Sequence, residues 1–189
     1  MCIGERMNYQ NWKKTVPNTI TNGSPWKMKA YRIALFVGDI GWRDVSKLML
    51  DKRTISVADQ LYRALGSISA NLAEGYSRGT GRDRARFYEY ALGSVRESKD
   101  WYYKARHILG DTVVEHRLSL LADTNWLLLT MIPQQRGKIL RENNTNYRTE
   151  SENISLLLNE ELLADIPFTD WTLRFTLYVL SVLSIEIPA

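Results

Sequence analysis

The chain of 189 residues contains one cysteine, two histidines and five prolines, and this scarcity argues against several classes of protein. Because Cys2 has no second cysteine to pair with, no disulfide framework exists within one chain, which favours a reducing compartment such as the cytoplasm. No Walker loop, HExxH, GxSxG or paired-cysteine signature occurs. His107 and His116 would form a metal site with Asp111 and Glu115 only if two helices converged there. We therefore expect no catalytic activity, no metal and no cofactor.

Long apolar runs are also missing. The N-terminal stretch MCIGERMNYQNWKK lacks the apolar centre of a secretory signal. Residues 171–187 are nearly all apolar, but they include Arg174 and Glu186 and fall short of the roughly 20 apolar residues that a membrane helix needs. We expect this segment to be a helix or strand that docks on another surface, and we expect no membrane partner.

Charge is unevenly distributed along the chain. The formal net charge is +4, and lysine and arginine outnumber the acids between residues 28 and 148. From Thr149 onward, Arg174 is the only base against seven acids. A basic body with an acidic tail is typical of a polyanion-binding domain with an appended segment, although a solvated surface with a chance imbalance gives the same pattern.

Apolar residues recur at three-and-four spacing in four stretches, which predicts helices over residues 26–50, 56–74, 82–109 and 112–132. In the first helix the predicted buried stripe includes Tyr31, Trp42 and Met49. Gly38 and Gly41 predict a kink or a close helix contact. The residues predicted to start later helices are Ser56, Thr80 or Gly81, and Asp111, and those predicted to end helices are Gly75, Gly110 and Pro133.

Short connections between long helices predict an all-α fold, an up-down-up-down antiparallel four-helix bundle. The bundle is expected over residues 27–133, after a loose N-terminal arm over 1–26 with a short turn near 8–14. A polar linker over 134–153 and an apolar, acidic C-terminal extension over 154–189 are expected to follow.

The run GSISANLAEGYSRG at 66–79, followed by RFY at 86–88 and ALGS at 91–94, resembles the four-helix bundle proteins first noticed in intervening sequences of large-subunit ribosomal RNA genes. The similarity covers residues 28–132, without the family's usual Leu–x–Val–Trp opening, and relatives include the accessory variability determinant of diversity-generating retroelements. The resemblance implies a ring-like homopentamer, which in the retroelement branch binds a reverse transcriptase and its RNA. For most members it implies no established activity.

The predicted turn between the second and third helices is rich in arginine. Its bases are Arg78, Arg82, Arg84 and Arg86, with Tyr76, Tyr88 and Tyr90 near enough to stack on bases. Arg82 and Arg86 are four residues apart on one helical face, and guanidinium groups at a helix start suit phosphate. Alternatively, the arginines pair with Asp83 and Glu89 or with a neighbouring subunit. Arg96 and Lys104 are further candidates, although their alternation with Glu97 and Asp100 is also typical of a solvated face.

The second predicted helix carries small residues beside its core stripe, which permits close approach of another helix. Arg63, Ser67, Asn71, Glu74 and Gly75 are assigned to packing and assembly, with Glu74 accepting from Arg63 or a partner chain. We expect a non-enzymatic, oligomeric bundle that binds RNA or DNA through the basic corner, which the acidic tail could cover as a phosphate mimic. The alternative is a protein–protein scaffold, for example an accessory subunit of a reverse transcriptase.

Overall fold

The structure is a computed structural model that describes residues 8–137, and within this range every regular element is a helix. The all-α prediction is therefore confirmed for the described residues. Most of the predicted linker and the whole predicted extension, residues 138–189, lie outside them. The elements in chain order are α1 (Tyr9–Thr15), α2 (Asn18–Thr21), the 3-10 helix η1 (Ser24–Lys27), α3 (Lys29–Leu48), α4 (Ile55–Tyr76), α5 (Gly81–Leu109) and α6 (Asp111–Arg136).

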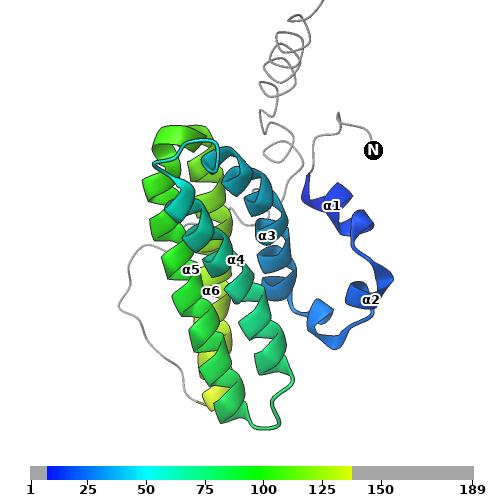
Figure 1. The fold of residues 1–189 in the computed structure, drawn as a ribbon. Coiled ribbons are helices and arrows are strands. Elements are labelled where there is room, and N and C mark those ends of the chain that lie inside the picture. The colour runs from blue at the N-terminus through cyan, green and yellow to red at the C-terminus, as the bar shows by residue number, and fades with distance from the viewer. Residues whose placement is uncertain (1–7, 138–189) are drawn as a thin grey trace, which may run out of the picture.

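Four long helices, α3 to α6, lie side by side (Figure 1). Helix α4 contacts α3 and α5, α5 contacts α6, and α3 also meets α6. Each helix turns an apolar face toward the shared centre, where burial of these side chains supplies the main stabilising free energy. The central side chains include Ile33, Ile40 and Leu48 of α3, Leu61, Leu65, Ile68 and Leu72 of α4, Val95 and Tyr102 of α5, and Leu121 and Leu128 of α6.

Helix α3 begins at Lys29 and remains continuous through Gly38 and Gly41, so the two glycines do not break the helix. The close contact is at Gly41, where an added Cβ would lie 2.4 Å from Leu65 Cδ1. The predicted buried stripe was wrong in part, because Trp42 is 60% exposed and Met49 is 58% exposed. The apolar residues of α3 occupy more than one side of the helix, and only one of these sides faces the core.

The described part of the N-terminal arm is helical and attached, whereas the sequence predicted a loose segment. Tyr9 and Trp12 of α1 are buried. Their rings lie 5.4 and 5.2 Å from the ring of Phe36, and the Trp12 indole N–H donates to Asp39 Oδ2. These aromatic contacts hold α1 against α3 and cover the Phe36 side of that helix.

Both ends of α5 follow local signals, whereas both ends of α4 and the start of α6 differ from the prediction. Thr80 caps α5 by accepting the Asp83 N–H, and Gly110 ends α5 with a φ of 88°. Helix α4 begins one residue before Ser56 and includes Gly75, which lies buried in its last turn instead of terminating it. Gly110, not Asp111, is the residue that precedes α6.

Helix α6 continues through Pro133 and ends at Arg136, so the predicted stop at Pro133 was wrong. A proline removes one N–H and so one backbone hydrogen bond, and near a helix end that loss does not prevent one further turn. Pro133 is itself buried. The chain leaves the helix at Gly137, whose left-handed φ of 66° suits glycine.

Candidate nucleic-acid interface and buried polar centre

The predicted basic corner is formed by three elements. The end of α4, the start of α5 and the end of α6 lie together at one end of the molecule (Figure 1). The contact is close, because a Cβ at Gly81 would lie 2.4 Å from the carbonyl oxygen of Gln135. Arg84 Nη1 also donates to Gln135 Oε1 at 3.1 Å. The sequence placed only α4 and α5 here, and the structure adds the last turn of α6.

Two of the four arginines hold the corner together. Arg78 forms an ion pair with Glu74 in the preceding turn, and its guanidinium lies 4.3 Å from the centre of the Phe87 ring. Arg84 donates to the Arg78 carbonyl oxygen at 3.0 Å as well as to Gln135. The expected Glu74–Arg63 contact is wrong within the described residues, because Arg63 lies 3.7 Å from Asp59 instead. Arg78 and Arg84 therefore have structural roles.

The other two arginines are exposed on the first turns of α5. The side chain of Arg82 is exposed to solvent. Arg86 Nε donates to the hydroxyl of exposed Tyr90 at 2.7 Å, and this hydrogen bond, with the nearby Tyr90 and Asp83 charges, raises the pKa of the guanidinium. Glu89, a possible partner for these arginines, pairs with Arg136 at 2.7 Å. The corner thus presents two cations to solvent.

The aromatic residues near the corner differ in availability. Tyr88 is buried, and its hydroxyl donates to the sulfur of Met28 at 3.4 Å. Tyr76 is half-buried. Tyr90 is 46% exposed and contacts Phe87 edge-on. Of the three predicted stacking residues, Tyr90 is the one whose ring is presented to solvent.

The two further basic candidates do not belong to the same corner. Lys104 is 18 residues beyond Arg86 on α5, which corresponds to about 27 Å along the helix. Its ammonium pairs with Asp100 at 2.5 Å and lies 4.2 Å from the Trp101 ring centre. Arg96 is exposed between these two positions. The structure therefore separates Arg96 and Lys104 from the corner along α5.

The remaining predicted motif residues serve α4 itself. Ser67 Oγ donates to the Arg63 carbonyl oxygen and Asn71 Nδ2 donates to the Ser67 carbonyl oxygen, both at 2.8 Å. A Cβ at Gly75 would lie 2.8 Å from Tyr88 Cε1 and 2.9 Å from Phe87 Cβ. Gly75 is required for the close approach of α4 to α5, and the serine and asparagine satisfy their polar groups locally.

Sequence reasoning missed a polar centre buried between α3, α5 and α6. Arg117 of α6, with no exposed side chain, donates to Asp44 of α3 through Nε at 2.8 Å and Nη2 at 3.2 Å. The Tyr102 hydroxyl of α5 donates to the same carboxylate at 2.9 Å. One feature of the sequence could have indicated this centre: Arg117 is three residues after Val114 and four before Leu121, so it lies on the predicted buried stripe of α6.

Burial and charge shift the pKa values in this centre. Burial raises the pKa of Tyr102 well above its usual range, and the Asp44 charge adds to the shift. Burial opposes ionisation of Arg117, yet the Asp44 charge and hydrogen bonds raise its pKa overall, so the guanidinium stays charged. His116 Nδ1 lies 2.7 Å from Arg117 Nη1, and as a neutral ring it accepts this bond. Burial and the Arg117 charge lower the pKa of His116 to about 4.

The His116 shift predicts a pH-dependent stability. Between the unfolded pKa of about 6.5 and the folded pKa of about 4, the unfolded chain binds more protons, so stability falls as pH decreases. The wild type should lose about 2–3 kcal/mol of unfolding free energy from this group over that window. Urea titrations at several pH values would show the loss abolished in His116→Gln and retained in His107→Gln, whose side chain is exposed. An equal decline in all three proteins would contradict the prediction.

Two absences within residues 8–137 bear on the kind of site. No group of three or more histidine, cysteine or acidic side chains in this range could hold a metal ion. None of the described helices is both long enough and apolar enough to span a membrane. What the described residues do present is an arginine-bearing corner and a buried polar centre.

These features define an all-helical protein in which four long helices surround an apolar core and carry a basic corner. Residues 28–118 match the family model described as 23S rRNA-intervening sequence protein, so this part of the chain is similar to that family. The family resemblance inferred from the GSISANLAEGYSRG run is thereby confirmed. The match spans α3, α4, α5 and the start of α6 and begins after the N-terminal arm. Comparison with curated proteins and with solved structures finds no match.

Proposed function

We propose that this protein is a non-enzymatic, cytoplasmic, oligomeric bundle that binds RNA or DNA phosphates through its basic corner. The observation that carries the proposal is that two of the corner arginines make structural contacts and the other two are exposed. Arg78 and Arg84 fix the corner, while Arg82 and Arg86 project from the first turns of α5. The positive end of the α5 dipole adds to their attraction for phosphate. Tyr90 offers a ring on which a base can stack.

The coarser features of the family and fold support the same function. The family name refers to an intervening sequence of 23S rRNA, which fits an association with nucleic acid. The short α4–α5 and α5–α6 connections and the pairwise helix contacts favour the up-down-up-down antiparallel arrangement. That arrangement supports a single end of the bundle at which α4, α5 and α6 present the corner.

Nucleic-acid binding is tested by the double substitution Arg82→Gln/Arg86→Gln. We expect affinity for a labelled RNA to fall roughly tenfold at low salt, because two phosphate contacts are lost. The slope of log affinity against log salt should decrease by about 1 to 2. Fluorescence anisotropy over a salt series, with single-stranded RNA and duplex DNA, measures both quantities. Sequence preference should not change.

The matched control is Lys13→Gln/Lys14→Gln, which removes the same charge from exposed positions on α1. This variant should retain the wild-type slope. Equal losses of affinity in both variants would show that net charge alone determines binding and would refute the corner as the binding site. Affinity that does not change with salt, or undetectable binding by the wild type, would refute nucleic-acid binding itself.

A protein–protein scaffold, for example an accessory subunit of a reverse transcriptase, is the second candidate. It is favoured by exposed small residues on adjacent helices: Gly66 and Ala70 of α4 and Gly93 of α5. A Cβ at either glycine would meet nothing within 4 Å, so another helix could approach closely. Light scattering tests the oligomer, for which the resemblance suggests a pentamer. A stable assembly with undetectable nucleic-acid binding would favour the scaffold.

A further inference from the structure

A cluster of exposed apolar side chains lies where α3 connects to α4. We call it the α3–α4 patch, and its members are Trp42 (60% exposed), Met49 (58%), Leu50 (70%), Ile55 (45%) and Tyr62 (43%). The rings of Trp42 and Tyr62 meet edge to face across the two helices, with centroids 5.4 Å apart. Apolar groups gathered in this way mark interaction surfaces more often than isolated exposed ones do.

The helical geometry makes the patch continuous. Trp42 of α3 and Met49, the residue that directly follows α3, are seven residues apart, and Ile55 and Tyr62 are seven apart on α4, so each pair lies on one side about two turns apart. The Trp42–Tyr62 contact joins the two faces. The patch therefore runs across neighbouring helices toward their connection.

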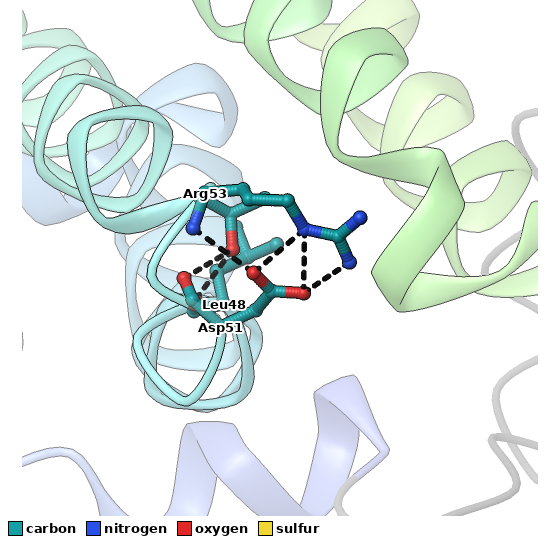
Figure 2. A network of polar contacts seen from close by, with 4 residues as sticks. Leu48, Asp51 and Arg53 are labelled. Carbon is teal, nitrogen blue, oxygen red and sulfur yellow. Dashed lines mark hydrogen bonds and ion pairs between the residues drawn. The ribbon is translucent and has the colours of Figure 1, made fainter.

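Polar contacts hold the connection in a defined conformation (Figure 2). The Thr54 hydroxyl donates to the Leu48 carbonyl oxygen at 2.6 Å. Arg53 pairs with Asp51 at 2.5 Å, and this interaction lowers the pKa of Asp51 to about 2, so the pair stays ionised at neutral pH. Because these contacts fix the backbone of the connection, Met49, Leu50 and Ile55 remain exposed at this end of the bundle.

Bases outnumber acids around the patch. Arg43 follows Trp42, Arg63 follows Tyr62, and Lys52 and Arg53 lie in the connection, whereas the acids are Asp51 and Asp59, which pair with Arg53 and Arg63. A second copy of this surface would bring like charges together, which opposes a symmetric contact through the patch. An apolar segment bordered by acids is a better complement.

The chain contains such a segment outside the described residues. Residues 171–187 are largely apolar and include Trp171 and Phe175. From Thr149 onward the chain carries seven acids and one base. The segment thus has apolar side chains that would be buried by docking, and it lies in an acidic part of the chain, opposite in charge to the residues around the patch.

The connecting chain is long enough to reach the patch. The α3–α4 connection is separated from the basic-corner end, where the chain leaves at Gly137, by the 22 residues of α4, about 33 Å (Figure 1). Residues 138–170 would span about 110 Å if fully extended and still about 50 Å if fully helical. Either conformation covers the distance.

We propose that residues 171–187 dock on the α3–α4 patch, which places this segment at the end of the bundle opposite the basic corner. This arrangement differs from a tail that covers the corner as a phosphate mimic. The corner arginines then remain open to phosphate while the tail is bound.

Photo-crosslinking of the full chain tests the proposal. Benzoylphenylalanine in place of Tyr62 should crosslink to peptides within residues 171–187, as identified by mass spectrometry. The same probe in place of Tyr103, 57% exposed on α5, serves as the matched control and should not capture this segment. Crosslinks from position 62 to α3 or α4 of another copy, detected with mixed isotope-labelled protein, would overturn the proposal in favour of self-association. Absence of any crosslink would overturn it as well.

Limited proteolysis gives an independent measurement. The substitutions Trp42→Ser/Tyr62→Ser should raise the rate of cleavage within residues 171–187 on the order of tenfold, because the docked segment is released. Tyr103→Ser should leave this rate unchanged. Equal cleavage rates in the wild type and the patch variant would show that the segment is not held there.

Discussion

Replacement of Arg117 by methionine should destabilise the folded protein by about 3–5 kcal/mol, since it leaves a buried carboxylate without its cation. Asp44 is only 5% exposed, and with Arg117 removed the side-chain donor that it keeps among residues 8–137 is the Tyr102 hydroxyl. Urea unfolding at a fixed protein concentration would measure the loss. This effect is large relative to the 5–15 kcal/mol that typically stabilises a domain.

Two further proteins make this prediction specific to the buried pair. The triple variant Asp44→Leu/Tyr102→Phe/Arg117→Met removes the carboxylate, the hydroxyl and the guanidinium together and should recover most of the lost stability. Arg63→Met breaks only an exposed pair with Asp59 and should change stability by less than about 1 kcal/mol. A loss in Arg117→Met no larger than that of Arg63→Met would show that the centre is not isolated from water.

The second large effect is expected at Gly75, where valine should cost about 2–3 kcal/mol. An added Cβ would lie 2.8 Å from Tyr88 Cε1 and 2.9 Å from Phe87 Cβ, so α4 and α5 would have to separate. The better helix propensity of valine offsets only a few tenths of a kcal/mol. Chemical denaturation with circular dichroism detection would measure the change.

Gly66→Val provides the matched control on the same helix. Gly66 is exposed, and a Cβ there would meet nothing within 4 Å. This substitution should alter unfolding free energy by no more than about 0.5 kcal/mol. Similar losses at both glycines would indicate that helix propensity, not the α4–α5 approach, determines the cost.

The parts of the fold that local signals specify were predictable from sequence. Thr80 and Gly110 set the two ends of α5, and each acts through neighbouring backbone groups. Trp42 was misplaced because α3 carries apolar residues on several sides, and periodicity does not show which side meets the core. Pro133 was misread because a rule for helix interiors was applied within one turn of the helix end.

The candidate site was predictable to the level of residue type and position on α5. Arg82 and Arg86 do share an exposed face, as their spacing required. The role of Arg84 depends on Gln135, which is 51 positions away in sequence. Asp44 and Arg117 are 73 positions apart, and no local pattern joins them. Such pairs emerge only when the helices are placed together in space.

The buried Asp44–Arg117–Tyr102 centre also bears on how the helices align lengthwise. Leucine-rich faces tolerate sliding of one helix along another by a turn of about 5.4 Å, because one apolar contact replaces another. Here such a slip between α3 and α6 would separate Asp44 from Arg117 and leave each buried charge without its opposite charge. We expect the centre to select a single axial register for the bundle, even though an apolar replacement should retain most of the stability.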